Sequence, residues 1–149
     1  MPQSYACLHY HLVFSTKHRA PLIPPDLQPR LYDYLGGLIR AEGGTLLAAG
    51  GVTDHVHLLV GLGQTRAVAD VLRVVKTNSS RWVHDIDPAG GFAWQTGYAA
   101  FTVSHSQLAT VERYIASQEE HHRRMTFENE LRALLQRHGI EPDERYLWG

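Results

Sequence analysis

One segment constrains the fold of this chain more than any other: Asp54-His55-Val56-His57-Leu58-Leu59-Val60. Alternate side chains of a β-strand point to opposite faces, so the apolar residues at 56, 58 and 60 can be buried while both histidines share the other face. Neutral imidazole binds divalent metals near pH 7, and a third ligand would complete a chelate with open positions for substrate. A purely structural histidine pair has the same pattern, and His9-Tyr10-His11 repeats the spacing, so the pair alone leaves both interpretations open.

A second informative pair is Tyr114 and Gln118, in a segment that predicts a helix from about Ser106 to Arg124. Ser106 is the expected N-cap. The tyrosine and the glutamine are four residues apart, so they share one helical face and their oxygens can enter the same pocket. Tyrosine has a pKa of about 10 and needs a metal or a base to act as a nucleophile at neutral pH. The alternative is a half-buried tyrosine beside a surface glutamine.

Periodicity and turn residues predict the remaining elements. The expected elements are a strand over 5–15, a helix from Asp26 to Gly43, strands over 45–49 and 55–62, a helix over about 68–82, one or two strands over 92–103, and a final helix over 127–138 capped by Thr126. This order is that of an α+β, ferredoxin-like (split β-α-β) domain with an antiparallel sheet. We expect helices on one face and the histidines and a nucleic acid strand on the other. Extra C-terminal helices, one of which carries the tyrosine, can then pack across the site or onto a second subunit.

Composition limits the class of protein. A length of 149 residues predicts a single domain over 1–149, and 44% hydrophobic with 19% charged residues exclude a disordered composition. The sequence has no apolar run of eighteen residues and no secretory signal, so we expect no membrane span and a cytoplasmic location. The single Cys7 forms no internal disulfide, which fits a reducing compartment.

The net charge of −1 is unusual for a protein that binds nucleic acid, but the basic residues are unevenly distributed. Residues 1–81 carry eight basic and five acidic residues, whereas the remainder carries six and ten. Arginine, whose planar fork suits phosphate, accounts for twelve of the fourteen basic residues. The candidates for phosphate contacts are Lys17, Arg19, Arg66, Arg73, Lys76 and Arg81. A simple solvated face is the alternative for each of them.

Several short motifs occur in a characteristic order: residues 10–17, the histidine segment 54–60, residues 94–101, Tyr114 to His122, and residues 143–148. Together they resemble the single-tyrosine HUH transposases of the insertion-sequence-200-like family, which are related to the REP-associated tyrosine transposases. The resemblance implies that His55, His57 and Gln118 bind Mg²⁺ or Mn²⁺ while Tyr114 attacks a DNA phosphate.

The implied reaction cleaves and rejoins single-stranded DNA at the ends of the element through a 5′-phosphotyrosine intermediate. The implied partners are single-stranded DNA with a hairpin and a second copy of the chain; the tyrosine helix acts in cis or in trans. Three aromatic residues, Trp94, Tyr98 and Phe101, either stack unpaired bases or belong to the core. Two rival functions stay open: a domesticated module that binds single-stranded nucleic acid, and a hydrolytic metal-dependent nuclease.

Neighbouring residues can assist the site. His121 follows Tyr114 by seven positions, on roughly the same helical face, as an auxiliary ligand or proton donor. Adjacent helical residues point about 100° apart, so His121 and His122 are not expected to face one metal together. Asp54 can orient a histidine ring, and His11 can face the same surface as the pair.

Overall fold

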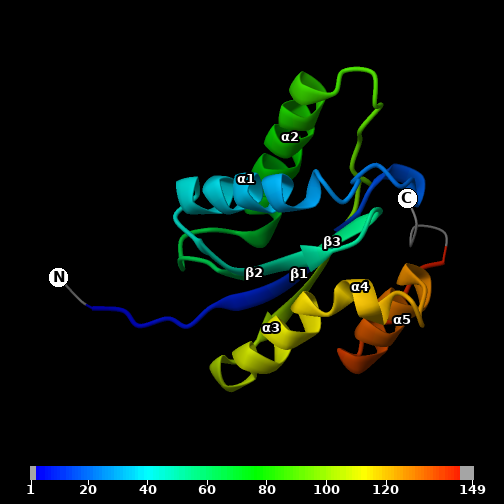
Figure 1. Ribbon diagram of the computed structural model, residues 1–149. Coiled ribbons are helices and arrows are strands. Elements are labelled where there is room, and N and C mark those ends of the chain that lie inside the picture. Colours follow the sequence, from blue (N-terminus) through cyan, green and yellow to red (C-terminus); the bar gives the residue numbers. More distant parts are fainter. Residues whose placement is uncertain (1–2, 145–149) are drawn as a thin grey trace.

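The computed structural model describes residues 3–144 and contains a four-stranded antiparallel sheet between two layers of helices (Figure 1). The strand order is β2-β3-β1-β4. The elements are β1 (His9–Ser15), a 3-10 turn (Lys17–Arg19), α1 (Gln28–Ala41), β2 (Thr45–Gly51), β3 (His55–Gly61), α2 (Val68–Ile86), β4 (Ala99–Val103), a 3-10 turn (His105–Gln107), α3 (Leu108–Ala116), α4 (Gln118–His121) and α5 (Phe127–Arg137). The predicted β-α-β-β-α-β order is confirmed.

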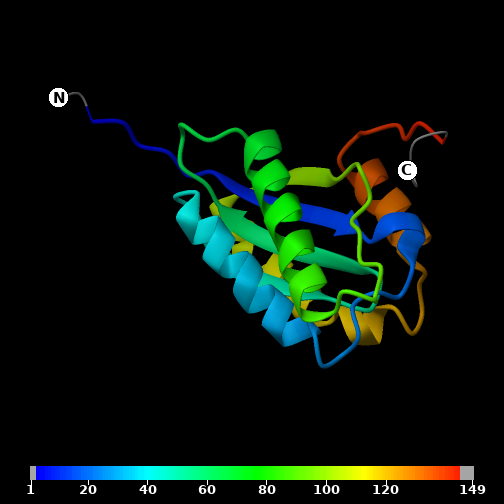
Figure 2. The same cartoon turned by 90° about the horizontal axis from the view of Figure 1, so that it is seen from above.

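Helices α1 and α2 cover one face of the sheet, and Figure 2 shows them lying across the strands. The alternation predicted for β3 is realised here, because Val56, Leu58 and Val60 are buried beneath these helices. Leu12 and Phe14 of β1 join the same core. Each such side chain stabilises the fold by about 1.5–3 kcal/mol when fully buried. This core fixes which way the odd-numbered residues of β1 and β3 point.

The other face of the sheet is also covered, so of the two placements expected for the C-terminal helices, the structure shows the one across the histidines. Helices α3, α4 and α5 lie on this side (Figure 1). The second core joins Val13 and Phe101 of the strands to α5 residues Phe127, Leu131, Leu134 and Leu135. The apolar residues of α5 recur at helical spacing and form a stripe that is buried against the odd-numbered residues of the strands. His55 and His57 are therefore completely buried.

The tyrosine helix is not continuous. A 3-10 turn precedes it, and α3 ends at Ala116 because Ser117 leaves helical geometry at φ −98° and ψ 16°. Ser106 makes no capping hydrogen bond to the helix, since Gln107 occupies the N-cap position. Thr126 does cap α5, and its hydroxyl accepts a hydrogen bond of 3.2 Å from the Asn129 amide. The break at Ser117 decides which side chains of α4 reach the site.

The remaining differences are local. Between residues 92 and 103, where one or two strands are expected, there is one, β4, and an isolated bridge joins Thr16 to Trp94. Positions 145–148 of the last motif lie outside the described residues. Within 3–144, no helix combines the length and the apolar character that crossing a membrane requires.

Gly50 of β2 lies directly against α3. A Cβ atom at this position would collide with the main-chain carbonyl oxygen of Ile115, the residue after Tyr114. We expect Gly50→Ala to lower the free energy of unfolding by about 1–3 kcal/mol, because backbone lies on both sides of the contact. Urea denaturation measures the change. Gly63→Ala is the control, since its Cβ would enter open space. Equal stability of the two variants would contradict this packing.

Candidate metal centre and adjacent tyrosine

Four side chains converge on one buried point between β3 and the C-terminal helices. The Nε2 atoms of His55 and His57 lie 3.4 and 3.0 Å from Oε1 of Glu130, which comes from α5. Nε2 of His122, at the end of α4, lies 2.9 Å from the same oxygen. The ligand atoms of these four residues all lie within 4.8 Å of one another. Three imidazoles and a carboxylate are a chemically suitable donor set for a divalent ion.

The rings of the histidine pair are oriented by neighbours on their other nitrogens. Nδ1 of His55 lies 2.7 Å from Oδ1 of Asp54, and Nδ1 of His57 lies 2.8 Å from Nε2 of His11. Each Nδ1 is thus engaged by a partner outside the centre, and each Nε2 faces the centre. Metal-binding histidines usually have such outer partners. The structure thus places Asp54 and His11 where the sequence suggested.

Gln118 lies at the same centre and is buried. Its Oε1 is 3.3 Å from Nε2 of His55 and 3.0 Å from Nε2 of His122. Its amide group donates to the main-chain oxygen of Tyr114 at 3.4 Å, which fixes the direction of the side chain. The predicted trio of His55, His57 and Gln118 is therefore brought together by the fold.

Tyr114 projects from α3 toward the same cluster. Its hydroxyl donates a short hydrogen bond to Oε2 of Glu130, and its ring meets the edge of His57 at a centroid distance of 5.7 Å. Burial raises the pKa of Tyr114 well above its usual value, and the carboxylate of Glu130 raises it further. The phenol is thus protonated at neutral pH and is held beside the paired histidines. Its oxygen needs a proton acceptor or a cation before it can attack.

The ionised carboxylate of Glu130 makes the centre favourable for a positive charge. Burial alone would raise the pKa of Glu130, but hydrogen bonds from His122, His55 and His57 hold it far below its usual range. Burial lowers the pKa of His57 to about 4. Burial also acts to lower the pKa of His55, but hydrogen bonds to Asp54 and Glu130 outweigh it and the pKa is raised. An ionised carboxylate is consequently enclosed together with neutral His57.

Glu130 and His122 were not identified from the sequence. Glu130 shares the helical spacing of Phe127, Leu131 and Leu134, so a carboxylate inside the apolar stripe of α5 was the available signal. The sequence pattern favours His121 over His122, because on a continuous helix His121 shares the face of Tyr114. The break at Ser117 instead brings Nε2 of His122 to the centre, whereas Nε2 of His121 lies 3.3 Å from the outer oxygen Oε2 of Glu130.

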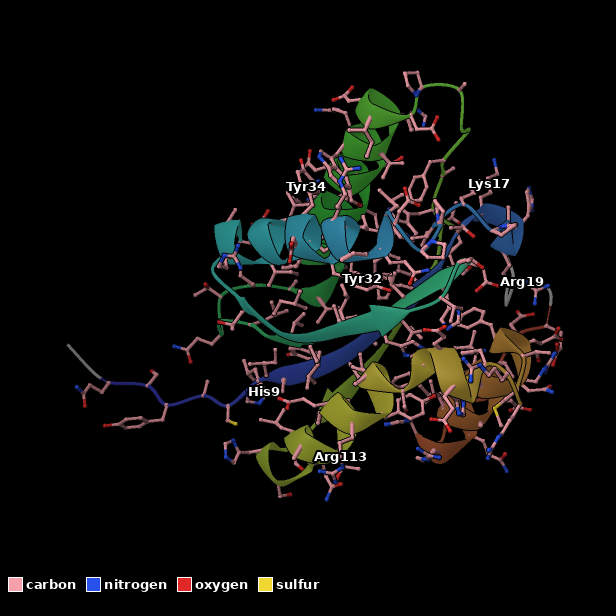
Figure 3. All side chains as sticks on the ribbon, in the orientation of Figure 1. His9, Lys17, Arg19, Tyr32, Tyr34 and Arg113 are labelled. Atoms are coloured by element: carbon pink, nitrogen blue, oxygen red, sulfur yellow. The ribbon has the colours of Figure 1, made fainter. Side chains whose placement is uncertain are left out.

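The basic candidates for DNA contacts fall into separate groups. Lys17 and Arg19 lie together at one end of the molecule (Figure 3). Arg73, Lys76 and Arg81 belong to α2, on the opposite side of the sheet from the histidines. The Lys76 ammonium donates to the main-chain oxygens of residues 95 and 97 at 2.6 and 2.9 Å, and burial lowers its pKa to about 8. Arg66, two residues before the first residue of α2, pairs with Glu42 at 3.2 Å.

Of the three candidate stacking aromatics, the structure leaves one accessible. Trp94 and Phe101 are buried in the two cores. Tyr98 is 42% exposed and lines a cavity of about 430 Å³ with Arg73 and Lys76. A base could stack at Tyr98 next to two cations.

A split β-α-β domain with paired histidines on a central strand and a tyrosine on a C-terminal helix is the architecture expected of an HUH transposase. Residues 4–118 match the family model described as "Transposase IS200 like", and the chain belongs to this family. The region of the match ends at Gln118, so His122 and Glu130 lie beyond it.

The individual proteins that the chain resembles are also transposases. The chain is 29% identical over 119 residues to the ISDra2 transposase TnpA of Deinococcus radiodurans, covering 76% of this chain and 85% of that protein. A crystal structure of a proposed transposase from Deinococcus radiodurans R1 is 28% identical with a TM-score of 0.63, covering 79% of this chain and 96% of that one. A REP-associated tyrosine transposase bound to a REP hairpin shares the fold, with 13% identity and a TM-score of 0.57 over 78% of this chain and 70% of that one. The protein is therefore a DNA transposase.

Proposed function

We propose that this transposase cleaves and rejoins single-stranded DNA at the ends of an insertion-sequence or REP-type element through a 5′-phosphotyrosine intermediate, with Tyr114 as the nucleophile. The observation that carries the proposal is the position of the Tyr114 hydroxyl, which is hydrogen-bonded to a carboxylate within the cluster of His55, His57 and Gln118. A tyrosine with no chemical role would not need to direct its hydroxyl into a group of metal-ligand side chains.

In the first step Oη of Tyr114 attacks the scissile phosphorus, a new P–O bond forms, and the bond to the 3′-oxygen breaks. The phenolic proton leaves Oη as the new bond forms, and the 3′-oxygen takes up a proton and leaves as a hydroxyl. Oε2 of Glu130 accepts the hydrogen bond of the phenol and holds Tyr114 in position for this attack. His55, His57 and Gln118 would hold Mg²⁺ or Mn²⁺, which when bound polarises the phosphate and stabilises the leaving oxygen. Asp54 and His11 keep the two imidazole rings in the orientation for this task.

The phosphotyrosine retains the energy of the broken bond, so the 3′-hydroxyl of another DNA end can displace Tyr114 without ATP. One tyrosine provides one covalent link. Excision and joining need two links, and we therefore propose a homodimer with two sites. The cluster itself is buried, but Tyr114 is only half-buried and lines a cavity of about 480 Å³ with His11 and Arg137, which gives a phosphate a path toward its ring.

The proposed substrate is single-stranded DNA near a hairpin. The structural neighbour bound to a REP hairpin supports this substrate, as does the family. An unpaired strand leaves its bases free to stack, which Tyr98 and the basic side chains of α2 would favour. Strand-transfer chemistry and base recognition would then use opposite sides of the sheet.

Oligonucleotides from the flanks of the protein's own gene, labelled separately at each end, test the reaction in the presence of Mn²⁺. We expect the 3′-side fragment to become linked to protein and the 5′-side fragment to be released with a free 3′-hydroxyl. A second strand with a 3′-hydroxyl should then be joined to the linked fragment. Cleavage with no protein-linked fragment would favour the hydrolytic nuclease, for which the histidine cluster alone would suffice, and binding without cleavage would favour the non-catalytic module.

We expect Tyr98→Ala to weaken binding of a single-stranded oligonucleotide about tenfold, because one stacked base contributes about 1–3 kcal/mol. Fluorescence anisotropy at fixed salt measures the affinity. Tyr5→Ala is the matched control, since Tyr5 is 89% exposed and lies in the N-terminal segment that precedes β1. An unchanged affinity in Tyr98→Ala would remove this residue from the DNA surface.

A further inference from the structure

We propose that His122 and Glu130 bind the same metal ion as His55 and His57, and that this ligand set selects a transition-metal ion such as Mn²⁺ over Mg²⁺. The inference deepens the proposed function and rests on it only for the location of the metal site. It adds two ligands from the C-terminal part of the chain to the trio that the family resemblance implies. Both lie after residue 118, where the match to the family ends.

The spacing of the donor atoms supports a shared ion. Ligand atoms about 2.1 Å from one ion, in tetrahedral or octahedral geometry, lie about 3.0–3.4 Å apart when they are neighbours. Oε1 of Glu130 lies 3.4, 3.0 and 2.9 Å from the Nε2 atoms of His55, His57 and His122. Oε1 of Gln118 lies at similar distances from two of these nitrogens. The donors are therefore already placed for coordination without a large rearrangement.

The buried negative charge of Glu130 also supports a bound metal ion. Glu130 has 1% of its surface exposed, and the residues that its carboxylate contacts as ion-pair partners are histidines. Burying a carboxylate is costly unless a positive charge compensates for it. No lysine or arginine within residues 3–144 forms an ion pair with Glu130; its ion-pair partners are histidines. A divalent ion would compensate the carboxylate and leave all the imidazoles neutral.

The chemistry of the donors determines the preferred ion. Mg²⁺ prefers oxygen ligands and usually keeps several waters. The set proposed here has three imidazole nitrogens, and imidazole favours transition metals and zinc. Five protein donors, with Gln118 included, also leave little space for a hydrated Mg²⁺ ion. We therefore expect tighter binding of Mn²⁺ than of Mg²⁺.

Glu130 also connects the ion to the nucleophile. Its Oε1 faces the imidazoles, and its Oε2 accepts the hydrogen bond from Tyr114. A single carboxylate can therefore hold both the ion and the tyrosine in fixed positions relative to each other. In this role Glu130 is a metal ligand and a positioning residue.

The test is calorimetric titration of the full chain, without DNA, with MnCl₂ and separately with MgCl₂. We expect Glu130→Gln and His122→Ala each to weaken Mn²⁺ binding at least about tenfold. Matched controls are Glu128→Gln, a half-exposed glutamate on the same helix that pairs with Arg19 and Arg132, and His105→Ala, an exposed histidine of the 3-10 turn. These controls should bind Mn²⁺ like the wild type. The wild type should bind Mn²⁺ at least about tenfold more tightly than Mg²⁺.

Circular dichroism reports whether each variant is folded, and Glu130→Asp provides a second variant that keeps the charge but shortens the side chain. Wild-type Mn²⁺ affinity in folded Glu130→Gln and His122→Ala would overturn the added ligands. Equal affinities for Mn²⁺ and Mg²⁺ would overturn the selectivity. Because no DNA is present, these results are independent of the proposed strand transfer, whose failure would instead appear as the absence of a protein–DNA adduct.

Discussion

Tyr114→Phe is expected to abolish the covalent protein–DNA adduct. Phenylalanine keeps the ring that contacts His57 and removes only the hydroxyl that Glu130 holds. Loss of a nucleophile in an enzyme of this kind reduces the rate by at least about a thousandfold. A denaturing gel of protein mixed with Mn²⁺ and labelled single-stranded DNA measures the adduct directly.

The matched control for this variant is Tyr34→Phe. Tyr34 lies on α1, on the opposite side of the sheet, where it stacks on Trp82 (Figure 3). Tyr34→Phe should form the adduct at the wild-type rate. If Tyr114→Phe still cleaves DNA at full rate, Tyr114 is not the nucleophile.

The second large effect is expected for His55→Ala. This change removes a nitrogen donor from the centre and the ring that stacks on Phe127 at 4.2 Å between centroids. Mn²⁺ affinity should fall by more than the roughly 10–100-fold that loss of an outer partner costs. The adduct should be lost with it. Calorimetry and the denaturing gel measure the two effects separately.

His9→Ala is the control, because His9 belongs to the other His-x-His pair of the chain and contacts neither His55 nor Glu130 in any interaction that the structure describes. Normal metal binding is expected in this variant. The reverse outcome, in which His9→Ala loses the metal and His55→Ala keeps it, would place the metal site at His9 and His11 and would contradict the site described here.

The sheet and its helices were predictable because each depends on a local pattern. The alternation of Val56, Leu58 and Val60 determined which face of β3 enters the main core, and this in turn placed His55 and His57 together. The covered second face was not predictable in the same way. It depends on how α5 packs back against Val13 and Phe101, a contact between distant parts of the chain.

The site was predictable to the extent that its residues lie on regular elements. Tyr114 and Gln118 were identified from their separation of four residues, and the structure places both at the histidine pair. His122 was missed because the break at Ser117 depends on tertiary packing rather than on a strong local signal. Glu130 was missed because a single carboxylate in an apolar stripe has no partner that the sequence alone can identify.

Peptide mapping of the wild-type adduct by mass spectrometry tests the proposed chemistry most directly. Protein cross-linked to a single-stranded oligonucleotide in the presence of Mn²⁺ is digested with nuclease and protease, and the modified peptide is sequenced. We expect one modified residue, Tyr114, carrying a nucleotide through its 5′-phosphate. A nucleotide on another side chain, or cleaved DNA with no modified peptide, would contradict tyrosine-mediated strand transfer.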